Sequence, residues 1–362
     1  MNLDRRHFLK LSATGALGAG AAAFLAACGA GGSSGTTVTA AYWPLSQAVV
    51  PKRVIEDYLA SHPDVTIDAI EATNGDTFPK LVSSVQLNPS KPLVNLGMFN
   101  GQSLAQGIAQ NLWHTPDLAK VPNLAKVTEA YRRTDGLAGD VVMDAMGLAY
   151  NTEALSTPPG SWYDLLDPKY RGKIVVGDAP AFSTNGVAVL NKLEGGDEDD
   201  LSKGLALFAE AARSGQFLAY STSNTQLRSL LQSGDAVIAS GSQGLFVPWI
   251  DEGDPIEFVA PGEGLQAFPE SFQIVAGSTD AQLDVVYELM NRLYEPSNVS
   301  AYSEATAVIP LVEGAVVPEK YRSRASFGLA AVENSITLDY GKLAEGAQNA
   351  TQIWNRDVKG QS

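Results

Sequence analysis

The segment Gly147–Asp178, GLAYNTEALSTPPGSWYDLLDPKYRGKIVVGD, decides the fold that the sequence predicts. It contains, in order, an apolar strand, a polar turn, a Pro/Gly break, a short helix around Trp162 and a second buried strand at 173–176. A chain that ends one strand, breaks and restarts with a new helix and strand is crossing between two lobes. The sequence therefore predicts two lobes, with a ligand site where the chain crosses.

Alternating strand and helix patterns on both sides of this segment predict an α/β fold. Upstream, a strand pattern at 38–43 precedes a helical pattern at 49–61 and a second strand pattern at 65–70, and a third strand is expected at 93–96. A strand, helix and strand in this order build a parallel sheet. Downstream, an apolar helix is expected at 187–193.

Two further connections are expected between the lobes. Strand patterns at 256–260 and 272–275 are separated by the segment 261–271, PGEGLQAFPES, whose Gly and Pro residues predict an irregular second crossing. A third connection is expected at 305–310, before the last helices. The polypeptide is thus expected to pass between the two bodies more than once.

The composition describes a folded protein and argues against several classes of partner. The 362 residues are 45% hydrophobic and 18% charged, which is ample apolar material for two lobes. A formal net charge of −15 and a pI near 4.6 argue against nucleic acid and anionic lipid as partners, since no basic stripe exists to neutralise phosphates. Solubility alone explains the acidity, and a cationic ligand is the sharper alternative.

Residues that carry catalysis or bind metals are scarce. After the first 27 residues the histidines are His62 and His114 and the cysteine is Cys28, which is little material for a zinc site or a Cys/His nucleophile. The pattern G-x-S-x-G occurs only at 31–35, GGSSG, which is not a strand–turn–helix elbow, and the sequence has no histidine-based triad or phosphate loop. We therefore expect a binding protein with no cofactor and no metal, and a secreted hydrolase is the less favoured alternative.

Residues 1–27 have the pattern of a signal peptide. Arg5 and Arg6 precede a run rich in small and apolar residues that ends in Leu-Ala-Ala before Cys28. The arginine cluster resembles the twin-arginine export motif, and the end resembles a bacterial lipoprotein cleavage box, which implies lipidation of Cys28. Residues 28–37 then form a flexible tether. We expect an exported protein, lipid-anchored at the outer face of the cell membrane or in the periplasm.

Five motifs in a fixed order resemble the extracellular solute-binding proteins of ABC importers (family 1), and within them the spermidine/putrescine-binding branch. They are GLAYNTE at 147–153, SWYDLLDP at 161–168, RGKI at 171–174, LLQSGDA at 230–236 and PGEG at 261–264. The resemblance implies a two-lobed periplasmic-binding-protein fold of type II, with hinge crossings and a ligand cleft between the lobes. It also implies that the protein delivers its solute to the permease subunits of a transporter.

The same resemblance implies how the chain is divided. Lobe 1 is expected to comprise 38–148 and 271–305, and lobe 2 to comprise 149–270 and 306–362. The crossings are expected near 149–151, 268–271 and 305–310.

The resemblance also implies three ligand-binding residues for an amine. Trp43 matches the aromatic residue after the first strand, Phe268 stands where the branch commonly has tryptophan, and Glu270 matches the acidic residue two positions later. Aromatic faces and carboxylates suit ammonium groups, through cation–π contacts and charge-assisted hydrogen bonds. We expect a polyamine or another amine-like solute.

Other candidate residues come from loops after predicted strands, and the sequence departs from the polyamine-binding pattern there. Ser183 and Thr184 offer hydroxyls in place of carboxylates, and Ser242 stands where a tryptophan-bearing loop is usual. Asn100 is placed either to face the cleft or to cap a helix, and capping explains Ser183 and Thr184 equally well. The alternative ligand is a small anionic or zwitterionic solute of the amino-acid or phosphonate type, with its anionic end set against these hydroxyls.

Overall fold

The computed structural model describes residues 35–178, 183–327 and 329–361. Its strands form one mixed sheet with the path β2-β1-β3-β10-β5-β8-β6-β7, while β4, β9 and β11 pair beside it. The strands are β1 (Thr36–Tyr42), β2 (Val65–Glu71), β3 (Leu96–Asn100), β4 (Trp113–His114), β5 (Val142–Asn151), β6 (Ile174–Gly177), β7 (Phe217–Ser221), β8 (Ile238–Ser242), β9 (Ile256–Val259), β10 (Gln266–Val275) and β11 (Ile309–Pro310).

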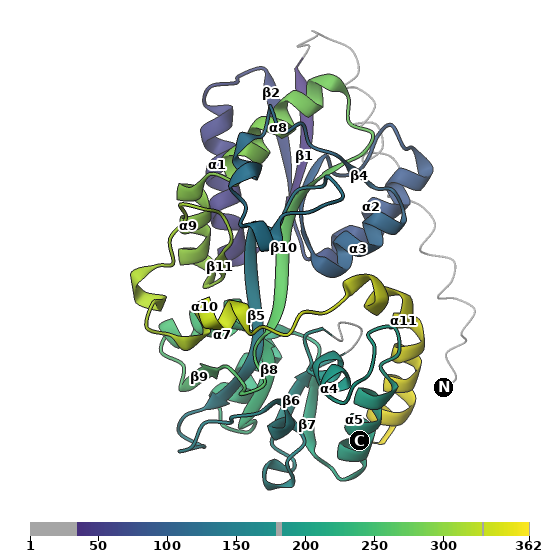
Figure 1. Cartoon of the computed structure of the whole chain (residues 1–362), viewed down its shortest axis with the longest axis vertical. Helices are drawn as coiled ribbons and strands as arrows, with labels where there is room; N and C mark the ends of the chain where they lie inside the picture. The colour runs from purple at the N-terminus through teal and green to yellow at the C-terminus, as the bar shows by residue number, and fades with distance from the viewer. Residues whose placement is uncertain (1–34, 179–182, 328, 362) are drawn as a thin grey trace, which may run out of the picture.

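Helices cover the sheet in two lobes (Figure 1). The α-helices are α1 (Val49–Leu59), α2 (Asn74–Leu87), α3 (Gly101–Ala109), α4 (Val187–Leu193), α5 (Ser202–Arg213), α6 (Asn224–Gln232), α7 (Gln243–Asp251), α8 (Asp280–Leu293), α9 (Pro296–Thr306), α10 (Leu329–Glu333) and α11 (Tyr340–Ile353). In Figure 1, α1, α2, α3 and α8 lie around β1 and β2 in the upper lobe, and α4, α5 and α11 lie around β6 and β7 in the lower lobe. Within the described residues, no helix has the length and apolar character needed to cross a membrane.

Two long antiparallel strands, β5 and β10, pass from one lobe to the other (Figure 1). One end of β10 pairs with β3 from Glu270 to Ile274, and its other end pairs with β5 from Gln266 to Glu270. Beyond Met146, β5 pairs with β8 and β9 of the lower lobe. A two-stranded ribbon of this kind has few neighbours where it leaves each lobe, which suits a hinge.

Each lobe has a core of its own. The upper core includes Val54, Met98 and Met290, which come from α1, β3 and α8. The lower lobe has a core around Trp162 and Phe208, with a further buried cluster against the other face of its strands. Because both bodies bury apolar side chains independently, they can move relative to one another without exposing either core.

Several predicted elements are confirmed. The strands β1 and β2 pair in parallel around α1, as the strand–helix–strand pattern predicted. The helix predicted at 187–193 is α4, and the apolar strand predicted at the start of the segment 147–178 is the end of β5. The two-lobed α/β architecture is therefore the one that the sequence predicted.

Two predictions were wrong. The third strand runs from Leu96 to Asn100, and not over 93–96. The apolar run continues through Phe99, and the first residues of that run follow a proline, which donates no backbone hydrogen bond. The second crossing is not an irregular loop, since β10 is regular from Gln266 to Val275. Pro269 is tolerated within β10 because it pairs only with β5, and pairing with β3 begins one residue later.

The register also bears on the predicted lobe boundaries, which remain a proposal. The segment 149–151, expected at the first crossing, pairs with β8 and β9 inside the lower lobe, whereas 142–146 pairs with β10. We therefore favour a first crossing at 142–146. The predicted tether is too long at its end, because Thr36 and Thr37 already belong to β1. The remainder of the signal peptide and tether, including Cys28, lies outside the described residues.

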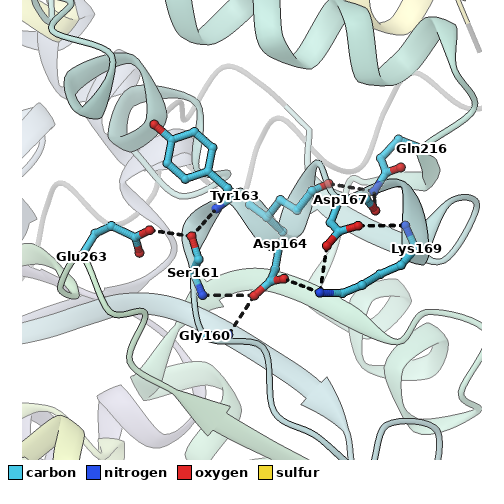
Figure 2. A network of polar contacts seen from close by, with 9 residues as sticks. Gly160, Ser161, Tyr163, Asp164, Asp167, Lys169, Gln216 and Glu263 are labelled. Carbon is cyan, nitrogen blue, oxygen red and sulfur yellow. Dashed lines mark hydrogen bonds and ion pairs between the residues drawn. The ribbon is translucent and has the colours of Figure 1, made fainter.

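A polar network joins two of the motifs that carried the family resemblance (Figure 2). The Oγ of Ser161 donates to Glu263 and accepts from the backbone N–H of Tyr163. The carboxylate of Asp164 accepts from the backbone of Ser161 at 3.1 Å and forms an ion pair with Lys169 at 3.1 Å. Since these bonds fix the short 3-10 helix 162–165 to the loop after β9, we assign the two motifs a structural role.

Candidate functional site

A cleft of about 500 Å³ lies between the lobes. Its walls come from the loop after β1, the starts of α2 and α3, the ribbon β5–β10, and the starts of α6 and α7. The lining residues used below are Trp43, Thr73, Asn100, Asp144, Met146, Asp178, Thr184, Ser223, Ser240, Ser242, Phe268 and Glu270. Parallel strands present their carboxyl ends and the following helix starts on one edge, which explains why these segments meet.

The hinge ribbon forms the floor of the cleft. Alternate residues of a strand point to the same face, so Phe268 and Glu270 of β10 share one face, as do Asp144 and Met146 of β5. Phe268 pairs directly with Asp144, which makes Glu270 the diagonal neighbour of Asp144 across the two strands. All four residues line the cleft. Two acidic side chains are thus held close together where the lobes join.

Glu270 is the most unusual residue of this floor. Its side chain is 0% exposed, and neither carboxylate oxygen has a hydrogen-bond partner. Burial raises the pKa of Glu270 well above its ordinary value, and the nearby carboxylates of Asp144 and Asp140 raise it further. An unpaired buried carboxyl group is costly to ionise.

Asp144 was missed in the sequence. It is 4% exposed, and its Oδ1 accepts from the backbone N–H groups of Ala145 at 2.8 Å and Gly244 at 2.9 Å. Burial raises its pKa from 3.8 to about 6, although the hydrogen bonds to the carboxylate act in the opposite direction. The available signal was a single acidic residue within an otherwise apolar strand, VMDAMGLAYN. A charged residue in such a strand is rarely buried without a role.

Two aromatic side chains stand near the acidic floor. Trp43 directly follows β1 and packs against the cluster that contains Met146 and Phe268, so it reaches from one lobe toward the other. The Nε1 of Trp43 is buried without a hydrogen-bond partner. Phe268 meets Tyr340 edge-to-face, with ring centroids 6.1 Å apart. The structure therefore brings Trp43, Phe268 and Glu270 into the same cleft, and their role in ligand binding stays a prediction.

Asn100 and Ser242 line the cleft and also cap helices. The Oδ1 of Asn100 accepts from the N–H of Ser103 at 2.9 Å at the start of α3, and the Oγ of Ser242 accepts from the N–H of Leu245 at 3.1 Å at the start of α7. The capping alternative is thus correct for Asn100. A capping side chain at the mouth of a cleft retains polar atoms that can contact a ligand.

The segment before α4 differs from its prediction. Thr184 lines the cleft, whereas Ser183 is 3% exposed and is not among the lining residues. The N-cap position of α4 is Gly186, with φ of +87°, so neither residue stands at the N-cap. The Oδ1 of the neighbouring Asn185 accepts from the N–H of Val187 at 3.1 Å, at the start of the helix. Phe182, which the sequence placed in the same loop, lies outside the described residues.

Charge is distributed unevenly around the cleft. Three carboxylates line it, and of these Asp178 is already paired with Lys359 at 2.7 Å. Among the described lining residues none is Lys, Arg or His. Within the described part of the chain, no group of three or more His, Cys, Asp or Glu residues is arranged to hold a metal ion. No basic side chain of the described lining therefore pairs with the other two carboxyl groups, those of Asp144 and Glu270.

Comparisons with known proteins agree with this geometry. Residues 53–327 match the family model described as bacterial extracellular solute-binding protein. No curated protein is detectably similar to this chain in sequence.

Solved structures of transport proteins share the fold. An ABC transporter structure from Clostridium perfringens is 19% identical with a TM-score of 0.71, covering 89% of this chain and 99% of its own. The spermidine/putrescine substrate-binding protein PotD from Streptococcus pneumoniae is 11% identical with a TM-score of 0.73, covering 90% and 100%. The TpPotD lipoprotein of Treponema pallidum is 18% identical with a TM-score of 0.68, covering 89% and 98%.

These likenesses establish the two-lobed solute-binding architecture. The family model spans most of the described chain, including both strands of the hinge ribbon and the residues of the cleft floor. The protein belongs to the bacterial extracellular solute-binding proteins, which capture small solutes for ABC transporters.

Proposed function

We propose that the solute captured by this protein carries a protonated amine. The observation that carries the proposal is Glu270, which lines the cleft with both carboxylate oxygens unpaired. Asp144 places a second carboxyl group beside it, and no basic side chain lines the described cleft to neutralise either. An ammonium group satisfies the unpaired carboxylate by charge-assisted hydrogen bonds, which are about twice as strong as neutral ones.

The aromatic residues support the same ligand class. Trp43 and Phe268 line the cleft, and Phe268 belongs to the floor itself, where it pairs with Asp144. Methylene groups of an alkylamine pack favourably against such rings, and a cation over a ring face gains about 0.5–2 kcal/mol. The two lobes then contribute different contacts to one guest, so that the guest stabilises the closed arrangement. We propose that the permease of an ABC importer receives the solute from this closed state.

A second candidate is a zwitterion with an amine at one end and a carboxylate at the other. The starts of α2, α3, α6 and α7 all reach the cleft, through Thr73, Asn100, Ser223 and Ser242. Helix N-termini attract anionic groups, because their first N–H groups lack partners within the helix. Asp144 accepts from the N–H of Gly244 at the start of α7. Asn100 and Ser223 each accept one N–H at the starts of α3 and α6, so the remaining N–H groups of α2, α3 and α6 are the candidates for a ligand carboxylate.

A thermal-shift screen with matched four-carbon solutes tests the ligand class. Putrescine has two ammonium groups, 4-aminobutyrate has one and a carboxylate, succinate has two carboxylates, and butanediol has no charge. We expect putrescine or 4-aminobutyrate to raise the melting temperature, since binding to the native state alone at about 100 times Kd adds about 2.7 kcal/mol of stability. Stabilisation by succinate and not by either amine would contradict the proposal.

A charge variant and its control complete this experiment. Glu270→Gln keeps the shape of the side chain and removes the negative charge, and we expect it to abolish most of the shift given by putrescine. Glu129→Gln changes an exposed carboxylate outside the cleft, and we expect the shift to persist.

Export and anchoring are proposed from the leader alone. We propose that cleavage precedes Cys28 and that the new N-terminal cysteine is lipidated. Mass spectrometry of the protein extracted from membranes tests this, because a diacylglyceryl group adds a defined mass that Cys28→Ser abolishes. A mature protein that begins at another residue, or that has an unmodified Cys28, would refute the anchoring.

A further inference from the structure

We infer that the amine displaces a proton from Glu270 when it binds, so that solute capture is linked to pH. The inference rests on the proposed amine ligand and concerns the protonation of Glu270 before the solute binds. It assigns to Glu270 two states: a neutral acid in the empty cleft and a carboxylate in the complex.

The geometry around Glu270 favours the neutral state. Glu270 has no solvent-exposed surface, and no donor from the described chain reaches either of its oxygens. An ionised carboxylate in such a place loses its hydration without compensation, and proteins avoid this cost by keeping the proton. Asp144, by contrast, accepts two backbone N–H groups, which stabilise its charge.

The titratable groups around Glu270 leave its charge without a counter-ion. From β5 it faces Asp144, and from the segment before β5 it faces Asp140. Tyr302 of α9 and Tyr340 of α11 also lie close enough to interact electrostatically with it. On β3 its pairing partner is Asn100, which is neutral. Acids and phenols surround the group, and the guanidinium of Arg133 interacts with Asp140.

An entering ammonium changes this balance. The neutral acid and the alkylammonium ion become a carboxylate–ammonium pair, and the proton of the acid passes to solvent, so charge and atoms are conserved. Where the empty site is protonated, affinity should rise about tenfold for each unit of increasing pH, until the pH exceeds the pKa of the empty site. Solute capture therefore weakens in acid, even though the amine itself stays protonated.

Infrared spectroscopy of the unliganded protein tests the first state without any ligand. We expect the carbonyl band of neutral carboxyl groups at neutral pH in the wild type, and a weaker band in Glu270→Gln, in which the buried Asp140, whose pKa is raised to about 7, still contributes. Glu270→Leu is a second variant that keeps an apolar side chain of similar volume, and circular dichroism checks that both fold. A band that is absent from the wild type, or that is as intense in both variants as in the wild type, overturns the inference.

Calorimetric titration with putrescine and with 4-aminobutyrate tests the second state. Titrations in two buffers of different protonation enthalpy give the number of protons released, which we expect to be about one for the wild type and for Glu129→Gln. Binding of either solute to the wild type without proton release overturns the inference and leaves the amine proposal intact. If neither solute nor spermidine binds, the amine proposal fails, and the infrared result still decides whether Glu270 holds a proton.

Discussion

Asp144→Asn measures how much the titration of the buried Asp144 carboxyl group contributes to the free energy of unfolding. Burial raises the pKa of Asp144 from 3.8 to about 6. This difference of about two units corresponds to about 3 kcal/mol, at 1.36 kcal/mol for each unit. Since the folded state holds the proton more tightly than the unfolded state, this stability is fully present below the unfolded pKa and is lost as the pH rises through about 6.

The variant removes this titration and keeps the fold. Asparagine retains an Oδ1 that can accept from Ala145 and Gly244, as the native side chain does. Urea unfolding at about pH 4 and about pH 7 gives the free energy of unfolding of both proteins. We expect the variant to gain about 2–3 kcal/mol relative to the wild type between the two conditions. The control is Asp68→Asn, which changes an exposed carboxylate of β2.

A difference between variant and wild type that stays constant across this range would refute the reasoning. It would mean that Asp144 is as easily ionised in the folded protein as in the unfolded chain. The same gain in Asp68→Asn would also refute it, because the effect would then report the overall negative charge and not the buried floor.

Two further substitutions test the framework around the cleft. Glu263→Ala removes a carboxylate that receives two hydrogen bonds, one of them from the Oγ of Ser161. We expect the free energy of unfolding, measured by urea titration, to fall by about 3 kcal/mol. A loss no greater than that of Glu319→Ala, an exposed control, would contradict the structural role of the motifs. Gly101→Ala places a Cβ 2.5 Å from the ring of Tyr340 and should lower the free energy of unfolding by about 1–3 kcal/mol. The control is Gly75→Ala, also in the first turn of a helix, whose Cβ meets its nearest atom at 3.6 Å. Equal stability of the two variants would show that α3 and α11 are not tightly packed.

The regular elements were predictable where local and tertiary forces agree. The helix α4 and the strand β5 are long apolar runs between turn residues, so their bounds followed from the pattern. The strand β10 was hidden, because Pro269 and Glu270 are typical of a loop and only pairing with β5 on one side makes them part of a strand. Such pairing joins segments more than 100 residues apart, which no local pattern contains.

The residues of the site were predictable only in part, because strand pairing, which no local pattern contains, also positions them. Trp43 and Glu270 were named from a family resemblance, and the structure brings them to one cleft. Asp144 could not be placed beside Glu270 from the sequence, because their proximity depends on the register in which β5 meets β10. Ser183 was named for its neighbours in the chain, and the fold buries it instead.

The most direct test of a solute site between the lobes is a crystal structure with the tightest-binding solute from the thermal-shift screen. We predict one solute in the cleft, with its amine within hydrogen-bond distance of Glu270 and its chain against Trp43 or Phe268. A solute bound elsewhere on the protein, or one in the cleft whose amine points away from both Glu270 and Asp144, would contradict the account.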